Sequence, residues 1–349
     1  MKKKILLAGL ALTGALLTVG ISSIQAYSLS PSVKTAADAT TQKVVAAAEA
    51  FIKTLSAAQQ KKVQFEWSDS KQKTQWSNLP TGIFQRNGVK LGELSSAQQT
   101  ALFGLLQSVL SKKGYEQIIQ VIDGDEALKN SSNGGNLIFG RAEYYVSFLG
   151  TPSTTSPWIL QFGGHHMAIN ATVAGADIVL TPSLTGGQPT KYTLNGKTVQ
   201  PIIAEPTAAF KLLSSLNATQ QKQAIIGAQF VDLVLGPGKD GKTLQPEGVK
   251  ALSLSTAQQE LLLGVVETRV GLLNDEDAAA KIKEIKANLA NTYFAWSGGT
   301  TASSAAYFRV SAPTLVLEFS PQSMGGDASN HVHSMYRDPT NDYGVNLYK

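Results

Sequence analysis

Two stretches of the chain carry apolar side chains at helical spacing, and each has a serine as its second residue. They are LSSAQQTALFGLLQSVL, residues 94–110, and LSTAQQELLLGVVETRV, residues 254–270. In the first, Ser95 or Ser96 can cap the N-terminus, as small hydroxyl residues do before an amphipathic helix. The spacing predicts that these apolar side chains share one face in each helix: Leu102, Leu105, Leu106 and Leu110, then Leu261, Leu262, Val265 and Val266.

Other apolar runs are rich in aromatic and β-branched residues and are bounded by Gly, Pro, Ser and Thr, which is typical of strands. Short turns between the runs favour antiparallel pairing. Because helices precede strands in each half of the chain, we expect an α+β fold. The runs are EYYVSFLG (143–150), WILQF (158–162), ATVAGADIVLTPSL (171–184), TYFAWSGG (292–299), AAYFRVSAPTLVLEF (305–319) and HVHSMY (331–336).

The chain also resembles itself at an offset of about 160 residues. TLSAAQQKK at 54–62 returns as SLNATQQKQ at 215–223, and residues 88–110 return as residues 248–270. EYYVSFLG is likewise echoed by NTYFAWSG at 291–298. We therefore expect two pseudo-symmetric repeats, about 40–195 and 200–349, each with helices followed by antiparallel strands, that together form one domain. The two sheets would join across a pseudo-twofold axis.

The first 26 residues have the pattern of a secretory signal peptide. A basic MKKK precedes an apolar stretch from Ile5 to Ile21, and Ala26 is suited to the position before a cleavage site. The remaining residues, 27–349, would then form a secreted, periplasmic or cell-envelope protein. An uncleaved N-terminal anchor is the alternative. The chain has no cysteine, which excludes disulfides and thiolate chemistry.

The charge balance changes once this segment is set aside. The full chain has 30 basic and 25 acidic residues, and removal of Lys2, Lys3 and Lys4 leaves 27 against 25, a net charge of +2. No basic cluster is interleaved with aromatic residues, so we expect no nucleic-acid partner. The chain has no polybasic amphipathic helix, so we expect no membrane partner once the signal peptide is removed. A small molecule, a peptide or a sugar remains as the substrate class.

All four histidines occur in two pairs. His165 and His166 are adjacent in QFGGHHMAIN, and His331 and His333 occur at i and i+2 in NHVHSMYRD. On a strand, the second pair projects from one face, a common way of offering two imidazoles to one metal. Each pair follows the second apolar strand of its repeat, so we expect both to converge on one metal site. One residue of the first pair would ligate, and the other would hold a carboxylate or a substrate.

Further ligands and catalytic groups come from the same regions. Glu205 begins the second repeat, and Glu318 interrupts the apolar run TLVLEF, where a carboxylate is costly unless it is paired or ligating. Alternatively, the face that carries Glu318 is simply solvated. Arg337 could hold a substrate carboxylate or phosphate, or pair with Asp338 or Asp342 to hold the C-terminal segment.

The choice of metal is open between zinc and copper. Met167, Met324 and Met335 flank the histidines, and His with Met in a chain without Cys suits copper. Methionine is equally an ordinary gap-filler in protein cores. A three-histidine site with an open position suits a divalent ion such as zinc.

Four longer segments resemble a known family. WSNLPTG, LSSAQQTALFGLLQSVLSKKGYE, GTPSTTSPWILQFGGHHMAIN and HVHSMYRDPTNDYG are similar to the bacterial secreted family termed domain of unknown function 3500, over nearly all of the chain after the signal peptide. The resemblance implies a secreted or envelope protein with one full-length domain, and it implies no activity. An aliphatic residue is usual in that family where this chain has Met167, which favours zinc over copper.

Three hypotheses follow. The first is an exported metal-dependent hydrolase with the histidines as zinc ligands, Glu205 or Glu318 as ligand or general base, and Arg337 orienting an anionic substrate. The second is a non-catalytic envelope protein that binds a metal or a small ligand. The third is a structural protein whose histidines only satisfy buried hydrogen bonds. No G-x-S-x-G, P-loop, H-E-x-x-H or dinucleotide-binding motif supports another enzyme class.

Overall fold

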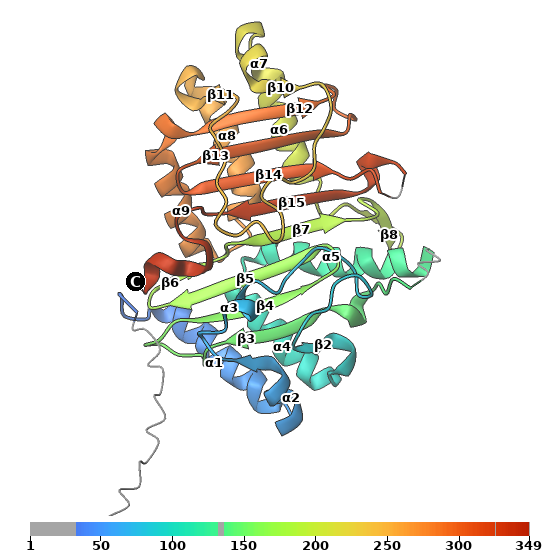
Figure 1. Cartoon of the computed structure of the whole chain (residues 1–349), viewed down its shortest axis with the longest axis vertical. Coiled ribbons are helices and arrows are strands. Elements are labelled where there is room, and N and C mark those ends of the chain that lie inside the picture. Colours follow the sequence, from blue (N-terminus) through green and yellow to red (C-terminus); the bar gives the residue numbers. More distant parts are fainter. Residues whose placement is uncertain (1–32, 132–135, 325, 349) are drawn as a thin grey trace, which may run out of the picture.

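One large β-sheet runs through the described part of the protein, with helices packed on one of its faces (Figure 1). The computed structural model describes residues 33–131, 136–324 and 326–348. The predicted signal peptide, residues 1–26, lies outside the described residues. Among the helices described, none combines the length and the apolar character needed to cross a bilayer.

The elements alternate between helix groups and strand groups. The helices are α1 (Ala39–Thr54), α2 (Ala57–Val63), α3 (Ser70–Lys73), α4 (Ser96–Val109), α5 (Lys112–Ser131), α6 (Ala204–Ser215), α7 (Ala218–Ala224), α8 (Thr256–Val270) and α9 (Asp275–Ala287). The strands of the large sheet are β1 (Gln64–Phe65), β2 (Val89–Lys90), β3 (Tyr145–Leu149), β4 (Trp158–Gly164), β5 (Met167–Ala174), β6 (Asp177–Val179), β7 (Ser183–Gly187), β10 (Ile225–Gly227), β11 (Val249–Lys250), β12 (Tyr293–Gly298), β13 (Ala306–Ala312), β14 (Leu315–Pro321) and β15 (Val332–Arg337). A separate hairpin contains β8 (Tyr192–Leu194) and β9 (Lys197–Val199).

The sheet is mixed and continuous. Its order is β1-β3-β4-β5-β7-β15-β14-β13-β12-β10, with β2 on β3, β6 on β5 and β11 on β12. Neighbouring strands are antiparallel except at β1·β3 and β10·β12, which are parallel. Antiparallel pairing of β7 with β15 joins the two halves of the chain into one sheet. The predicted α+β class is therefore confirmed, and the two halves share one sheet.

Both stretches with predicted helical spacing form helices. Ser95 and Ser255 are the N-caps of α4 and α8, and each side chain accepts a hydrogen bond from the backbone N–H three residues later. The apolar faces of these helices pack into a core shared with one face of the sheet. Members of that core on α4 and α8 include Leu102, Leu105, Leu106, Leu262, Val265 and Val266.

Loops cover the opposite face of the sheet. We call them the 74–88 loop, between α3 and β2, and the 228–248 loop, between β10 and β11; Figure 1 shows both crossing in front of the strands. On β14, Leu317 and Phe319 face the helices as the alternation predicts, and Glu318 faces the loops. Glu318 is only 1% exposed. The alternative that this face is solvated is therefore wrong, because the 228–248 loop covers it.

Candidate functional site

The first histidine pair forms the turn between β4 and β5. Gly164 pairs with Met167 at the end of this hairpin, so His165 and His166 are its two turn residues. His166 itself takes the left-handed conformation, with φ of 60°, which residues with a side chain rarely adopt. Gly164, directly before the turn, allows close approach: a Cβ there would lie 2.9 Å from the Tyr144 ring.

The second pair lies at the start of β15. His333 is opposite Gly186 of β7 and Ser320 of β14. Because β7 also pairs with β5, the β4–β5 turn and the start of β15 lie close together at the same end of the central strands. The sequence suggested that the two pairs occupy equivalent positions in the two halves, and they do not. One pair is in the turn after β4, and the other begins the last strand of the second half.

The topology nevertheless brings three of these histidines together. One ring nitrogen each of His166, His331 and His333 lies within 4.8 Å of the others, and all three residues are buried. His166 Nε2 lies 2.9 Å from His331 Nε2. This is the number and type of ligands found in three-histidine zinc sites.

The hydrogen bonding of His331 fixes which of its nitrogens carries a lone pair. Its Nδ1 is 2.8 Å from the backbone oxygen of Met324, which only accepts hydrogen bonds, so Nδ1 is the donor. Burial lowers the pKa of His331 below its ordinary value, which favours the neutral ring. In that ring Nε2 has the lone pair, and it points at His166. A donor bond from one nitrogen to a backbone carbonyl is typical of metal-ligating histidine.

Burial favours the neutral form of the other two rings as well. Burial lowers the pKa of His166 and of His333 well below the usual range, and the neighbouring imidazoles lower both further. The side-chain nitrogen of Asn78 lies over His333, 3.3 and 3.2 Å from its two ring nitrogens. The backbone oxygen of Asn78 also accepts a hydrogen bond from the backbone N–H of His166, at 3.4 Å. Asn78 thus holds the two histidine segments together.

His165 belongs to a different arrangement. Its ring packs against that of His166, with centroids 3.6 Å apart and the planes tilted by 34°, and its Nδ1 lies 2.6 Å from a carboxylate oxygen of Asp125 on α5. The other oxygen of Asp125 accepts a hydrogen bond from the backbone N–H of Gly140. The predicted carboxylate partner of the paired histidines is therefore present. Sequence reasoning did not identify it, although Asp125 follows Ile118 and Val121 at helical spacing on a buried face, which was the available signal.

Glu205 is not near these histidines in the sheet. It lies at the start of α6, and its carboxylate accepts a hydrogen bond from Ser334. Ser334 is next to His333 on β15 but faces the helices, because neighbouring strand residues point to opposite faces. Burial raises the pKa of Glu205, and the charge of Arg269 opposes this. The sheet thus separates Glu205 from the histidines, which contradicts its predicted role as ligand or general base.

Glu318 is on the same side of the sheet as the histidines, but both of its carboxylate oxygens accept hydrogen bonds from other residues. Its two oxygens accept the backbone N–H groups of Val234 and Leu235 at 2.8 and 2.7 Å. The Tyr307 hydroxyl donates a third bond, also at 2.8 Å. The carboxylate anchors the 228–248 loop, so it is not a free metal ligand or base as predicted.

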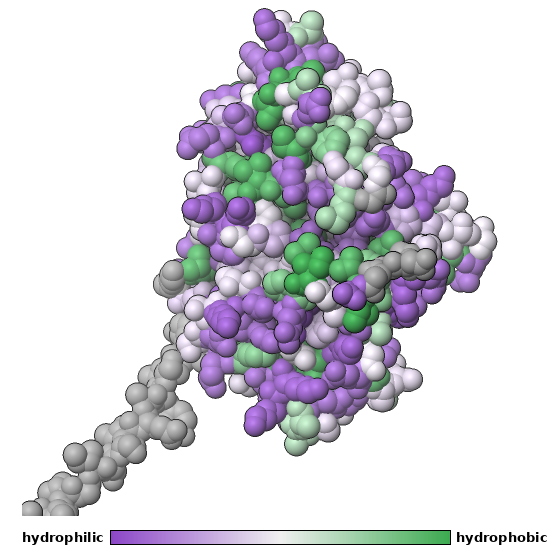
Figure 2. Space-filling view, turned by 45° about the vertical axis from the view of Figure 1, so that its right-hand side comes forward, coloured by the Kyte–Doolittle hydropathy of each residue, from purple (hydrophilic) through white to green (hydrophobic). Residues whose placement is uncertain are grey.

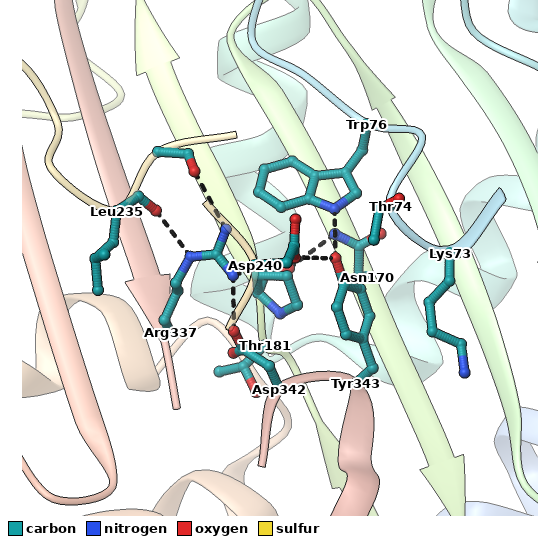
Figure 3. Close-up of polar contacts among 12 residues, drawn as sticks. Lys73, Thr74, Trp76, Asn170, Thr181, Leu235, Asp240, Arg337, Asp342 and Tyr343 are labelled. Atoms are coloured by element: carbon teal, nitrogen blue, oxygen red, sulfur yellow. Dashed lines mark hydrogen bonds and ion pairs between the residues drawn. The ribbon is translucent and has the colours of Figure 1, made fainter. Parts of the chain in front are cut away.

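Arg337 holds the same loop from the next strand. Figure 3 shows its guanidinium donating to the backbone oxygen of Leu235, at 2.8 Å, and pairing with Asp342, at 2.7 Å. It also donates to the Gly236 carbonyl and to Asp240. Four of the five guanidinium N–H groups thus have partners within the fold, and Arg337 is only 1% exposed, which contradicts the predicted grip on an anionic substrate. The alternative pairing with Asp342 is confirmed.

The methionines do not form a copper site. Met167 packs in the helix-side core, and Met335 packs in a small cluster with Trp76, Ala168 and Leu184. Met324 is 73% exposed, and it contributes its backbone oxygen to His331. Two of the three sulfurs are therefore ordinary core atoms, and the groups that could hold a metal consist of imidazoles, with the Asp125 carboxylate in one of them beside His165 and His166.

A cleft of about 720 Å³ opens over the histidines, within the range of small-molecule sites. The 74–88 loop, the segment after α5 and the 228–248 loop form its walls. In Figure 2, hydrophobic side chains (green) gather near the middle of the molecule on the side turned forward. The histidines that line the cleft are His165, His331 and His333, and His166 lies behind them.

A family model described as protein of unknown function (DUF3500) matches residues 37–345. The chain belongs to this family. The DUF3500 match covers both histidine pairs, Asp125 and both loops that wall the cleft. No curated protein and no solved structure matches the chain.

Proposed function

We propose that this DUF3500 protein is a metal-dependent hydrolase with zinc bound by His166, His331 and His333. The observation that carries the proposal is the meeting of three neutral imidazoles from two distant segments, with the Nε2 lone pair of His331 directed into the group. Zinc is preferred to copper because the ligands are nitrogens and the methionine sulfurs lie elsewhere.

Hydrolysis is favoured by the position of the cleft and of His165. Bound zinc would lower the pKa of a water molecule and polarise a carbonyl or phosphoryl oxygen. His165 lines the cleft, and Asp125 engages its Nδ1, which leaves Nε2 as the nitrogen available to take a proton from water. Asp125 stabilises the charged imidazole that results.

The test of this activity uses chromogenic substrates. Purified protein without a histidine tag, stripped with a chelator and reloaded with zinc, is assayed with 4-nitrophenyl butyrate and bis(4-nitrophenyl) phosphate. We expect turnover that is lost in the stripped protein and restored by zinc. Turnover that survives stripping, or that persists in the His331→Asn/His333→Asn variant, would contradict the proposal.

Non-catalytic metal binding is the second candidate, and one observation favours it. Asn78 lies directly over the His333 ring, and His166 is only 1% exposed, which together resemble a closed site. Structural zinc sites are closed, whereas catalytic ones keep a position for water. Zinc bound at one ion per chain without zinc-dependent turnover of any substrate would favour this candidate.

We also propose that the two halves of the chain are structural repeats. Support comes from matching helix starts: Gln98 and Gln59 exchange side-chain hydrogen bonds near the caps of α4 and α2, and Gln258 and Gln220 do the same near α8 and α7. The test is a solved structure: superposition of the two halves should match these helices and strands in order.

We propose export through cleavage after Ala26, on the basic and apolar pattern of residues 1–26. The mass of the protein recovered after expression in a bacterium with an intact export pathway tests this. A mature N-terminus at Tyr27 is expected, and a full-length cytoplasmic product would contradict the proposal.

A further inference from the structure

The cleft over the histidines has a polar floor and apolar walls. The lining residues that lie in a strand of the sheet or directly beside a strand end are all polar: His165, Gln188, Gln322, His331 and His333. The three surrounding loops contribute mainly apolar side chains, which are Leu79, Pro80, Ile83, Phe84, Leu137, Phe139, Leu233 and Pro237. Such a cleft fits a molecule with a polar reacting group at one end and an apolar body.

Several wall residues remain available for contact. Ile83 is 55% exposed and Leu79 is 39% exposed, although both are large apolar side chains. Apolar surface gathered around a concave site is typical of a ligand-binding surface. Covering it with an apolar group would release the water in contact with it and so favour binding.

The charges around the cleft argue against an anionic ligand. Arg337 is buried, and four of its five N–H groups donate to carbonyls and carboxylates. Arg86, which belongs to the 74–88 loop, donates from Nη2 to the backbone oxygens of Ser77, Leu79 and Gly164, and its Nη1 is buried away from the cleft surface. The charged residues on the cleft lining are Asp232 and Lys239, one of each sign. Phosphate-binding sites instead present free arginines or helix N-termini.

The walls are also held in place before any ligand binds. Arg86 ties the 74–88 loop to the histidine turn, and Glu318 with Arg337 ties down the 228–248 loop. A rigid wall reduces the entropy lost on binding. The cleft is therefore a pre-formed apolar site rather than one that forms around its ligand.

We infer that the cleft binds uncharged esters or amides that carry an apolar acyl chain, with the carbonyl at the histidines and the chain between the loops. The identity of the reacting group rests on the proposed hydrolytic function. In that reaction water adds to the carbonyl carbon, and the acyl C–O or C–N bond breaks. The leaving group takes the proton that water gives up, so the products are a carboxylic acid and an alcohol or amine.

Binding is tested without turnover, on the full chain stripped of metal. Dissociation constants of butanamide, hexanamide and octanamide are measured by isothermal titration calorimetry. Each added methylene should tighten binding roughly threefold if it is buried against the walls. Ile83→Asn should weaken octanamide binding by about threefold or more.

A matched control separates the wall from general surface effects. Leu252 is 60% exposed and lies outside the cleft lining, so Leu252→Asn should leave all three constants unchanged. Equal constants across the amide series, or equal effects of the two variants, would overturn this inference while zinc-dependent turnover could still hold. Chain-length dependence without any zinc-dependent turnover would instead overturn the proposed function alone.

Discussion

At the residue scale, the site depends on two imidazole nitrogens that face each other. His331 donates from Nδ1 to a carbonyl, so its Nε2 is an acceptor, and that atom lies 2.9 Å from His166 Nε2. In the absence of metal, only a proton carried by His166 Nε2 can join the two. A zinc ion bound to both lone pairs is the alternative. The same arrangement of His166 and His331 is therefore compatible with a hydrogen bond between the two rings and with both rings binding one zinc ion.

Asp125 provides a test at this scale, because its side chain is fully buried against His165. Asp125→Asn removes the charge and leaves one acceptor oxygen, so either the bond with His165 or the bond from the Gly140 N–H is lost. We expect the free energy of unfolding to fall by about 2 kcal/mol, as for other buried bonds to charged groups. Urea denaturation measures this.

The control for that variant is on the same helix. Asp123 pairs with Arg141 at 3.4 Å on a more exposed part of α5, so Asp123→Asn should cost less than about 0.5 kcal/mol. Equal losses in the two variants would show that the Asp125–His165 contact is not the cause.

At the element scale, the strands were predictable and the loops over them were not. Period-two alternation separates Leu317 and Phe319 from Glu318, and helices bury the face that carries the two apolar side chains. We expected the opposite face to bind a metal or to be solvated. The 228–248 loop covers this face, and it has no periodic pattern from which its packing could be predicted. This loop accounts for the wrong roles predicted for Glu318 and Arg337, which both bind it.

Glu318→Gln tests whether this carboxylate anchors the loop or holds the metal. The new amide would face the backbone N–H of Val234 or Leu235 with a donor, so one bond is lost. We expect exchange of these two amide protons to quicken roughly tenfold or more. Hydrogen exchange read by NMR gives the rates.

The same variant should leave metal binding intact. Zinc affinity within about threefold of the unchanged protein is expected, because loss of a metal ligand, or of a group hydrogen-bonded to one, typically reduces affinity by tenfold or more. A stoichiometric loss of zinc in Glu318→Gln would restore the carboxylate as a ligand and contradict the loop-anchor role.

At the scale of the whole molecule, pairing of β7 with β15 creates the site. It places the β4–β5 turn beside the start of β15, although these segments are 165 residues apart at His166 and His331. The clustering of all histidines in two pairs allowed their convergence to be predicted. The strand order did not follow from the sequence, because the long-range pairings depend on packing that no local pattern records. Glu205 was misplaced for this reason: it follows the histidine strand region in the chain but lies across the sheet.

Burial of neutral histidines makes stability depend on pH. The folded-state pKa values of His166 and His333 are lowered by burial, so below pH 6.5 the unfolded chain binds more protons than the folded chain. Stability is therefore present above pH 6.5 and falls as the pH drops through that value. Each additional proton contributes about 1.4 kcal/mol per pH unit.

Denaturation of the metal-free protein between pH 7.5 and 5 measures this slope. The His331→Asn/His333→Asn variant should show a shallower dependence, since it has two fewer titrating groups. An equally steep slope in both proteins would place the acid sensitivity elsewhere in the molecule.

The most direct test of the account is zinc binding by the protein without a tag, measured by calorimetry and by elemental analysis after dialysis. We predict one zinc per chain, with at least a hundredfold weaker binding in His331→Asn/His333→Asn, which removes two of three ligands. His165→Asn, which leaves the three-histidine group intact, should still bind one zinc. Failure to bind zinc, or equal binding by the double variant, would contradict a metal centre at His166, His331 and His333.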